Sequence, residues 1–294
     1  MPTELSTGMI GNFELTAIET GRFRLDGGAM FGVVPKTLWS KKLPADEKNR
    51  IPMAMRCLLV KSRATDKIYL IDNGSGTKFN DKMERIYALD YDHSNLTDSL
   101  SSAGIKPSDI TDVIFSHLHF DHCGGTTFYD DKGELKHLFE NATYHVNKRH
   151  WNNANNPNTR EQASFLTENI EPISESGRLN LVSDNHEFEN GFDTIPVNGH
   201  TIGQQLPRIQ DENRTLLFAA DLLPTFAHVP IPWVMGYDMY PVQTLEEKET
   251  ILHKAAENNW HFFMEHDADN EIITVKKENN RFSFKNAATL STLL

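Results

Sequence analysis

Residues 117–122 read His-Leu-His-Phe-Asp-His and directly follow an apolar stretch. Alternate residues of an extended segment point the same way, so His117 and His119 converge on one side of the chain. Asp121 and His122 are adjacent, and a turn there directs both at a neighbouring position. Imidazole suits zinc, iron or copper, and a carboxylate adds a hard oxygen ligand. Four potential ligands within six residues therefore predict a site that holds more than one divalent ion.

The composition is that of an ordinary globular protein. The chain has 294 residues, of which 38% are hydrophobic and 24% charged. This length can bury a sizeable core without disulfides or other staples. No Gly/Ser/Pro-rich linker divides the sequence, so we predict one domain over residues 1–294. Cys57 and Cys123 are the only cysteines, which excludes a disulfide scaffold.

Charge and hydropathy narrow the choice of partners. A net charge of −12 disfavours a nucleic-acid partner, because phosphate contacts need Lys and Arg. A signal peptide starts with a basic segment followed by an apolar stretch. The chain starts with Met-Pro-Thr-Glu and lacks this pattern, so we expect no signal peptide. No apolar run approaches the length that spans a membrane. We expect a cytoplasmic protein that acts on a small molecule, without nucleic acid or membrane.

Periodicity and turn residues predict alternating strands and helices. The predicted strands are Phe13–Thr20, Cys57–Ser62, Lys67–Ile71, Asp112–Ser116, Ala142–Val146, Thr194–Val197, Gln205–Ile209, Thr215–Ala220, His261–Glu265, Glu271–Lys276 and Arg281–Phe284. The predicted helices are Leu96–Ala103, Glu161–Asn169 and Leu245–Glu257. Thr244 and Glu247 fit a capping box at the start of the last helix. Strands in two groups with helices between them indicate two sheets flanked by helices.

Three later residues can complete a two-ion site. His200 follows the predicted strand Thr194–Val197, Asp221 follows the strand Thr215–Ala220, and His266 follows the strand His261–Glu265. Each stands where a strand meets a loop, a place at which a scaffold presents a side chain rigidly. A single His or Asp at such a position is usually a cap or a surface residue. The three together, after the motif at 117–122, favour a shared metal site.

The motifs resemble those of the metallo-β-lactamase-fold hydrolases, nearest the branch of the lactonases and methyl-parathion-type hydrolases. The segments that carry the resemblance are 116–125, Gly199-His200-Thr201, Ala220-Asp221 and Glu265-His266, with a similar lead-in at 104–110 and a similar turn at Asp72-Asn73-Gly74. The resemblance spans roughly residues 13 to 285. It implies an α/β protein with an αββα sandwich, in which two mixed sheets are flanked by helices and a dinuclear centre lies at one edge.

The resemblance also implies roles for single residues. The first ion would be bound by His117, His119 and His200, the second by Asp121, His122 and His266, and Asp221 would bridge both. The cofactor would be two divalent ions, zinc before iron, manganese or cobalt. Asp72 would either orient a ligand histidine or form the turn before Gly74.

The implied reaction is hydrolysis of a lactone, ester or phosphotriester bond by a hydroxide that bridges the ions. Metal binding lowers the pKa of water from about 15.7 to about 7, which makes a nucleophile available at neutral pH. The catalytic residues would be Asp221, through its bridge, and Asp121, which could orient the hydroxide or carry a proton to the leaving group.

One position departs from the acyl-lactone hydrolases of this fold. Many of them place a Tyr three residues after the bridging Asp, where this chain has Pro224. Help for the developing oxyanion must come from elsewhere, with His228, Tyr237 and Tyr240 as candidates. The departure weakens an assignment as an acyl-homoserine lactonase and favours a methyl-parathion-like hydrolase.

Two apolar loops, at residues 26–35 (followed by Trp39) and 226–235, are candidates for the substrate wall. We expect Phe31, His228, Trp233 and Tyr237 to contact the substrate. An apolar pocket beside a metal pair favours a neutral or apolar substrate. Core packing and a contact in a homodimer are the other uses of such loops, and one loop can serve both pocket and dimer.

Other functions share parts of this pattern. A glyoxalase-II-like thioesterase is the main alternative, although the tail after His266 matches its basic glutathione site poorly. A sulfur dioxygenase needs a single iron and fewer ligands than this chain offers. A nuclease is disfavoured by the acidic charge balance. A metal-stabilised binding protein has no evident need for an open two-ion site.

Overall fold

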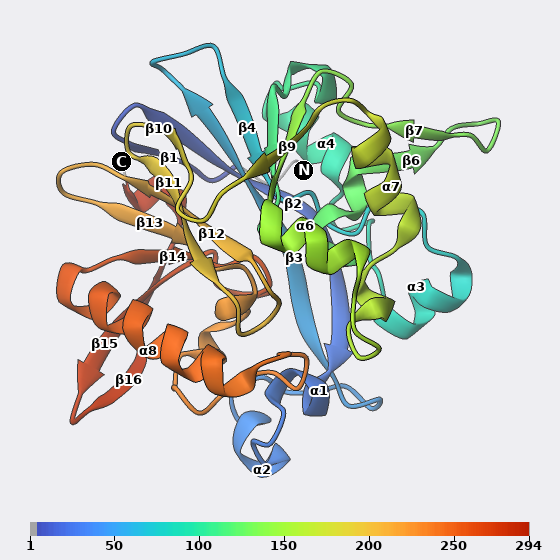
Figure 1. The fold of residues 1–294 in the computed structure, drawn as a ribbon. Helices are drawn as coiled ribbons and strands as arrows, with labels where there is room; N and C mark the ends of the chain where they lie inside the picture. Colours follow the sequence, from blue (N-terminus) through green and yellow to red (C-terminus); the bar gives the residue numbers. More distant parts are fainter. Residues whose placement is uncertain (1–4, 294) are drawn as a thin grey trace.

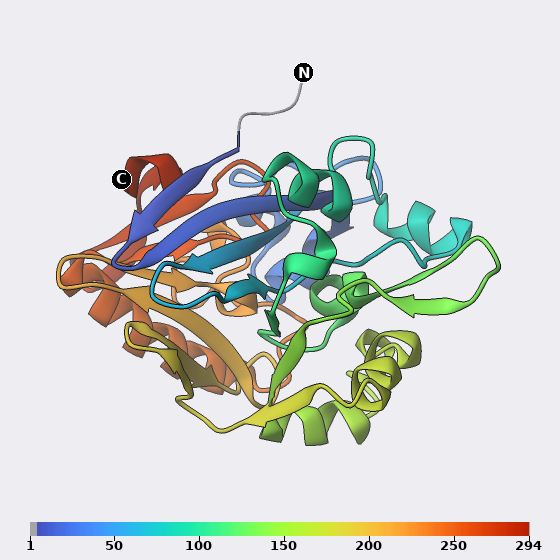
Figure 2. The same ribbon diagram turned by 90° about the horizontal axis from the view of Figure 1, so that it is seen from above.

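The computed structural model describes residues 5–293, which form a four-layer sandwich of helices, two facing sheets and helices (Figures 1 and 2). Seven strands form each large sheet, and both sheets mix parallel and antiparallel pairs. The predicted αββα sandwich of two mixed sheets flanked by helices is therefore confirmed.

The first sheet comes mainly from the N-terminal half of the chain. Its strands in spatial order are β1 (Thr7–Ile10), β2 (Phe13–Asp26), β3 (Arg50–Ser62), β4 (Ile68–Ile71), β5 (Asp112–Ile114), β8 (Thr143–Asn147) and β9 (Leu179–Val182). The first four strands pair antiparallel, and β4, β5, β8 and β9 run parallel. A hairpin of β6 (Thr127–Tyr129) and β7 (Leu135–His137) projects from this half.

The second sheet comes from the C-terminal half. Its strands in spatial order are β10 (Glu187–Glu189), β11 (Phe192–Val197), β12 (Gln204–Gln210), β13 (Thr215–Phe218), β14 (His261–Phe263), β15 (Ile272–Glu278) and β16 (Arg281–Ala288). Neighbours are antiparallel except β13 and β14, which run parallel. A parallel pair needs a crossover connection, and α8 (Pro241–Asn258) lies in that connection.

Helices cover the outer faces of both sheets. On the first sheet these are α4 (Leu96–Ser102), α6 (Lys148–Asn155) and α7 (Thr167–Glu175), and on the second sheet α8 (Figure 1). Four further α-helices lie in the described part of the chain: α1 (Gly27–Phe31), α2 (Lys36–Trp39), α3 (Asp81–Tyr87) and α5 (Phe120–Cys123). The main core lies between the sheets, where Leu15 and Val60 of the first sheet pack with Leu206 and Phe262 of the second.

Several predicted boundaries differ from the structure. The strand predicted over Phe13–Thr20 continues to Asp26, and the one predicted from Cys57 already begins at Arg50. The helix predicted over Glu161–Asn169 is wrong: a 3₁₀ turn at Gln162–Ser164 precedes α7, because Phe165 is extended and interrupts the helical path.

The predicted start of the long C-terminal helix is also wrong. The helix α8 begins at Pro241, three residues before Thr244. The ring of proline fixes a helical φ and needs no amide partner, so it suits the first helical position. The Thr244 hydroxyl bonds the carbonyl of Tyr240 one turn earlier, as an interior residue does, and caps nothing.

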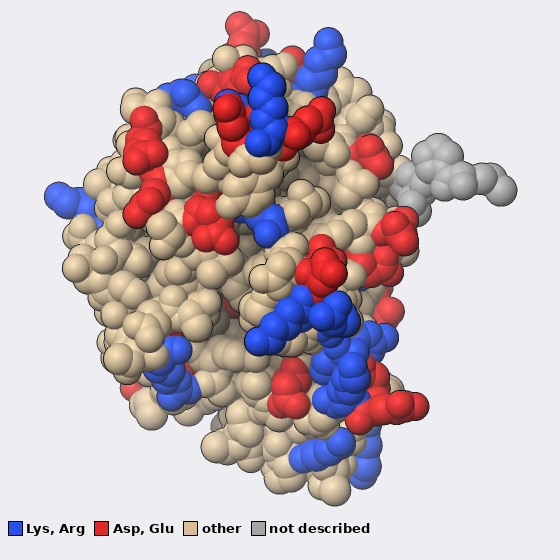
Figure 3. All heavy atoms as spheres, turned by 90° about the vertical axis from the view of Figure 1, so that its right-hand side faces the viewer, with Lys and Arg blue, Asp and Glu red and all other residues tan. Residues whose placement is uncertain are grey.

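Charges are mixed on the face of the molecule shown in Figure 3. Acidic and basic side chains lie next to one another in small groups. Neutral surface separates these groups. Among the described residues, every helix is too short or too polar to cross a lipid bilayer.

Candidate metal centre

The candidate ligands lie at one edge of the sandwich because parallel strands end there together. The strand β4 precedes Asp72, β5 precedes the motif at 117–122, β13 precedes Asp221, and β14 precedes His266. The carboxyl ends of parallel strands open on the same edge of a sheet. Hydrogen bonds join the sheets beside this edge, among them those from the backbone amide of Gln205 to the Ser116 carbonyl and from its side-chain amide to the Phe115 carbonyl.

Three imidazole nitrogens form the first cluster. Nδ1 of His119 lies 3.1 Å from Nε2 of His117 and 3.2 Å from Nε2 of His200. Asp221 completes this group, whose four ligand atoms all lie within 4.8 Å of one another. All four residues are buried. The sequence motif thus supplies two of the nitrogens, and the turn between β11 and β12 supplies the third.

A second cluster joins Asp121, His122 and His266, again with ligand atoms within 4.8 Å. Nε2 of His266 lies 3.1 Å from Nε2 of His122. Asp221 stands between the clusters: its Oδ2 is 3.1 Å from Nε2 of His200, and its Oδ1 is 3.1 Å from Nε2 of His266. The seven predicted ligands are therefore brought together in the arrangement that the resemblance implies.

The donor set fits divalent ions better than it fits a hydrogen-bond network. Zinc–nitrogen bonds of about 2.0–2.1 Å in a tetrahedral site place two imidazole nitrogens about 3.4 Å apart. The converging nitrogens are separated by 3.1–3.2 Å, close to that spacing. One Asp221 oxygen, Oδ1, is buried without a well-aligned hydrogen-bond donor among the described residues. Imidazole nitrogens and carboxylate oxygens that converge in a buried site are stabilised by a cation.

The outward nitrogens of the first cluster meet oxygen atoms that orient the rings. Nδ1 of His200 lies 3.0 Å from an oxygen of Asp238, and Nε2 of His119 lies 3.2 Å from an oxygen of Glu161. Nδ1 of His117 donates to the Ser116 hydroxyl at 3.0 Å when Nε2 serves as the ligand atom. Such partners select the tautomer and the ring angle of a ligand histidine. Asp238 and Glu161 carry no motif signal, so sequence reasoning missed them.

The second cluster is oriented in the same way. Nδ1 of His266 lies 2.9 Å from the Ala54 carbonyl of β3. Nδ1 of His122 lies 3.1 Å from Asp72 and also 3.1 Å from Glu265. Asp72 therefore has both of the roles considered for it. It forms the turn, where its φ is 55°, and it also faces His122, a candidate ligand.

A third group of acidic and histidine side chains consists of Asp72, His122 and Glu265. In this group both carboxylates face the nitrogen of His122 that points away from the candidate metal position. Nδ1 of His122 carries at most one proton, and Asp72 is the better-aligned acceptor. Burial, partly offset by His122 and reinforced by Asp72, raises the pKa of Glu265 to about 8. Burial therefore favours the neutral form of Glu265 beside Asp72.

The Asp221 carboxylate favours positive charge on the two histidines that it contacts. Burial by itself lowers the pKa of His200 and His266, but the Asp221 carboxylate raises these values to about 10 and about 9. Burial and the neighbouring imidazoles lower the pKa of His117 well below its usual value. Although burial opposes its charge, the surrounding histidines keep the pKa of Asp221 well below its usual value. Protons and metal ions compete for these nitrogens, so metal binding should release protons.

The backbone beside the ligands is unusual at two positions. Ala220, directly before Asp221, has a φ of 41°, a left-handed conformation that costs a residue with a Cβ about 1–2 kcal/mol. Gly124 has an ordinary φ of −65°, so its backbone conformation does not require glycine. A glycine is needed at this position because a Cβ would collide with the Ser75 carbonyl.

A cavity of about 210 Å³ opens onto the clusters and exposes Asp121, Asp221, His119 and His266 to a bound molecule. Its other walls are mostly apolar or aromatic, with one guanidinium and the hydroxyls of one serine and two tyrosines. These residues are Leu25, Met30, Met53, Tyr87, Phe120, Arg160, Ala163, Ser164, Met235 and Tyr237.

Of the four predicted substrate contacts, only Tyr237 lines this cavity. Phe31 is fully buried and stacks on both Trp39 and His228, with ring centroids 5.3 and 4.6 Å apart. Trp233 packs edge-on against Phe31 at 5.8 Å. Phe31, His228 and Trp233 therefore form packing behind the cavity wall.

The loop that carries Tyr237 and Asp238 is anchored from α8. Lys248 is buried and donates to the carbonyls of Pro230, Ile231 and Trp233 at 3.1, 3.3 and 2.7 Å. All three ammonium protons are thus used to hold one loop.

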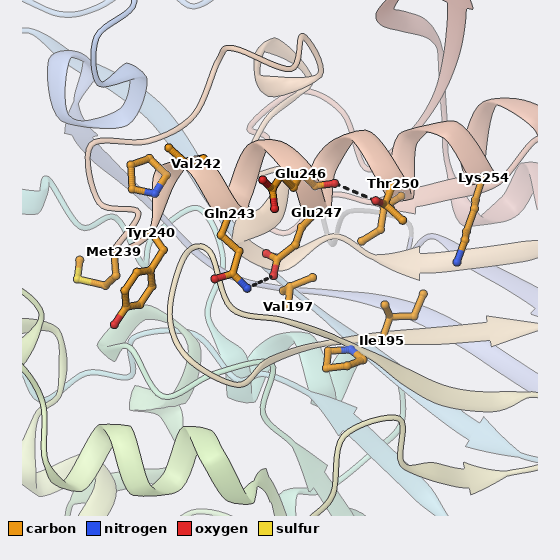
Figure 4. Close-up of a pocket in the computed structure, with 13 residues that line it drawn as sticks. Ile195, Val197, Met239, Tyr240, Val242, Gln243, Glu246, Glu247, Thr250 and Lys254 are labelled. Atoms are coloured by element: carbon orange, nitrogen blue, oxygen red, sulfur yellow. Dashed lines mark hydrogen bonds between the residues drawn. The ribbon is translucent and has the colours of Figure 1, made fainter.

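A larger groove of about 680 Å³ lies elsewhere, between β11 and α8 (Figure 4). Tyr240 lines this groove and is absent from the lining of the metal-side cavity, which leaves Tyr237 as the better-placed of the two tyrosines. The groove lining includes Glu246 and Glu247, but neither belongs to a candidate metal-binding group among the described residues.

Comparisons with known proteins agree with this geometry. A family model described as the metallo-beta-lactamase superfamily matches residues 56–260. A probable metal-dependent hydrolase from Staphylococcus aureus is 30% identical, with a TM-score of 0.84, over 95% of this chain and 99% of that chain.

Two more distant structures share the fold. AidC, a dizinc quorum-quenching lactonase, is 23% identical with a TM-score of 0.78 over 97% of both chains. AbOPH, a hydrolase in the beta lactamase superfamily, is 18% identical with a TM-score of 0.79 over 98% of this chain and 99% of that chain.

Proposed function

The chain belongs to the metallo-β-lactamase superfamily and is a metal-dependent hydrolase, and we propose that it uses two divalent ions, zinc before others, to hydrolyse a lactone, ester or phosphotriester bond. The observation that carries this proposal is the position of Asp221. Its two oxygens each lie 3.1 Å from a histidine nitrogen, one in each cluster. A single ion would need only one of these two carboxylate oxygens.

We assign His117, His119 and His200 to one ion, and Asp121, His122 and His266 to the other, with Asp221 between them. Bound together, two such ions lower the pKa of water to about 7, polarise a carbonyl or phosphoryl oxygen and neutralise the leaving oxygen. The chain itself supplies ligand orientation through the oxygens on the outer nitrogens. It also limits water, because all seven ligands are buried and only one face opens to the cavity.

Asp121 is suited to moving a proton. It lines the cavity and is 8% exposed, so a bound substrate can reach its carboxylate. Its oxygens lie 3.8 Å from the nitrogens of His122 and His266, longer than a hydrogen bond. An oxygen with free lone pairs at this place can accept a proton from the attacking water and pass it to the leaving group.

Tyr237 is our candidate for the group that assists the oxyanion. Pro224 provides no hydroxyl, and His228 is occupied by Thr225 and the Met30 carbonyl at 2.8 Å each. Burial, helped by Tyr87 and nearby carboxylates, raises the pKa of Tyr237 to about 12. The phenol therefore keeps its proton at neutral pH and can donate it as a hydrogen bond.

The substrate range is supported by the cavity and by the relatives. An apolar wall beside two polarising ions suits an ester-like bond. AidC, a lactonase of the same fold, supports keeping lactones within that range. A glutathione thioester, the substrate type of the alternative thioesterase function, belongs in the test panel.

Metal analysis and a substrate panel test the proposal. Purified protein loaded with zinc should hold about two ions per chain and turn over at least one of an acyl lactone, an aryl ester and a phosphotriester. Asp221→Ala should lose metal and turnover together. Asp131→Asn, which removes an exposed carboxylate near the β6–β7 hairpin, is the matched control and should keep both.

Three results would contradict the proposal. Full activity in Asp221→Ala would remove the bridging role. One metal per chain with oxygen consumption would indicate a dioxygenase. Preference for the glutathione thioester would favour the thioesterase alternative.

A further inference from the structure

We propose that Arg160 selects substrates that carry a carboxylate at the end of a short chain attached to the scissile ester, so that the preferred substrates are compact anionic esters or lactones. The inference rests on the proposed hydrolase function and specifies the chemistry of its substrate. It replaces the expectation of a neutral or apolar substrate, because the cavity combines an apolar wall with a guanidinium.

Arg160 is held at the mouth of the cavity by its backbone. It belongs to the segment between α6 and the 3₁₀ turn at Gln162–Ser164. The side chain of Asn158 accepts from the amides of Arg160 and Glu161 at 2.9 and 3.1 Å. Glu161 in turn faces His119 at 3.2 Å. The position of Arg160 is therefore tied to the metal cluster through its direct neighbour in the chain.

The side chain of Arg160 reaches across the mouth to the opposite loop. Its NH2 group donates to the carbonyl of Gly236, next to Tyr237. This is the one side-chain hydrogen bond of Arg160 within residues 5–293, and no acidic side chain in that part of the chain forms an ion pair with it. A guanidinium carries five N–H donors, so most of its donors stay available to a ligand.

The chemistry of a free guanidinium points to a carboxylate. Arg160 is the only Lys or Arg in the described lining of the cavity. Its planar fork binds a carboxylate through two parallel hydrogen bonds. The Arg160 side chain is exposed to solvent, so its donors are accessible to an incoming molecule. Asp121 and Asp221 occupy the same cavity, but their oxygens face the histidines.

The size of the cavity limits the rest of the substrate. Its volume of about 210 Å³ is below the roughly 300–1,000 Å³ of most small-molecule pockets. A compact ester or lactone with one charged end fits these dimensions better than a long acyl chain. The charged end would pair with Arg160 while the scissile group lies at Asp121 and Asp221.

Two matched esters test the inference. Monophenyl glutarate and phenyl pentanoate have acyl chains of equal length and differ in one terminal carboxylate. For the zinc-loaded wild type, kcat/KM should be higher with the anionic ester. In Arg160→Met, which removes the guanidinium but keeps an unbranched side chain, the ratio of the two kcat/KM values should fall about 10- to 100-fold, the range for a charge-assisted hydrogen bond. Arg160→Lys should retain part of the ratio, since an ammonium lacks the fork.

A control and a binding measurement separate the possible failures. Arg149→Met removes an exposed guanidinium of α6 that pairs with Asp184, and it should leave the ratio unchanged. Calorimetric titration should detect binding of glutarate to the wild type and loss of that binding in Arg160→Met. An unchanged ratio in Arg160→Met, or glutarate binding that survives the substitution, would overturn the role of Arg160. Glutarate binding through Arg160 without turnover of either ester would instead contradict the proposed hydrolytic reaction.

Discussion

At the scale of single residues, the oxygens on the outer histidine nitrogens control how well the site holds metal. Asp238 faces Nδ1 of His200 with one oxygen at 3.0 Å and accepts from the Met235 amide with the other at 3.2 Å. It therefore fixes the ring of one ligand and the cavity loop at the same time. Removing a ligand-orienting carboxylate typically costs about 10- to 100-fold in metal affinity or activity.

We predict that Asp238→Ala lowers zinc affinity by about that factor, while Asp238→Asn loses less, since an amide oxygen still accepts from His200. Titration against a competing chelator measures both affinities. Asp131→Ala serves as the surface control. Equal losses in the two Asp238 variants would show that the hydrogen bond to His200 is not the cause.

A second residue far from the metal centre controls acid stability. Asp112 is buried and contacts Nε2 of His145 at 2.7 Å and Nζ of Lys67 at 2.8 Å. Burial opposes its charge, but these hydrogen bonds lower the pKa of Asp112 to about 2. A folded pKa below the unfolded value of 3.8 adds stability that is complete above about pH 4 and is lost as pH falls through 2.

The expected contribution of Asp112 is about 2 kcal/mol. Denaturant unfolding at pH 6 and pH 3 should show a larger loss of stability for the wild type than for Asp112→Asn, which does not titrate. An identical pH dependence in both proteins would contradict this assignment.

At the scale of elements, helix ends offer a test of backbone strain. The helix α3 ends at Ala88, which has a left-handed φ of 46°. The helix α4 ends at Ala103, which has an ordinary φ of −78°. Glycine adopts the left-handed region without steric cost, but it loses more entropy on folding than alanine.

We predict that Ala88→Gly stabilises the protein by about 0.5 kcal/mol, because relief of the left-handed strain exceeds the entropic cost. Ala103→Gly, the matched control, should destabilise it by about 1 kcal/mol. Thermal unfolding measures both changes. A loss of stability in Ala88→Gly as large as in the control would argue against strain at this helix end.

At the scale of the whole molecule, the metal centre should contribute to cooperative stability. The ligands come from both sheets, and the two sheets share one core between them. An ion that binds only the folded state stabilises it by about 2.7 kcal/mol at a concentration 100 times its Kd. Removing the metal therefore weakens the link between the halves of the chain.

We predict that a chelator lowers the unfolding temperature by several degrees and that zinc restores it. Our proposal of a single domain predicts one transition in both states. Calorimetry of the wild type and of Asp221→Asn, which should respond little to zinc, makes the comparison. Two separate transitions would contradict the single domain.

Much of the fold followed from local patterns. The buried strands β5, β13 and β14 are short apolar runs, and such runs were identifiable because parallel strands are buried on both faces. Boundaries were less accurate where tertiary contacts override local signals. Thr244 has a good capping pattern, yet Pro241 begins the helix, and Glu161 is drawn out of a helix to face His119.

The sequence by itself determined the ligand chemistry, because metal ligands are limited to a few residue types and the motif at 117–122 packs four of them at one strand end. Only the tertiary structure decided the rest. It placed Tyr237 and Arg160 at the cavity, left Phe31 and His228 in the packing behind it, and set Asp238 on His200. The physical reason is that these contacts join segments far apart in the chain, and their geometry depends on how two sheets pack.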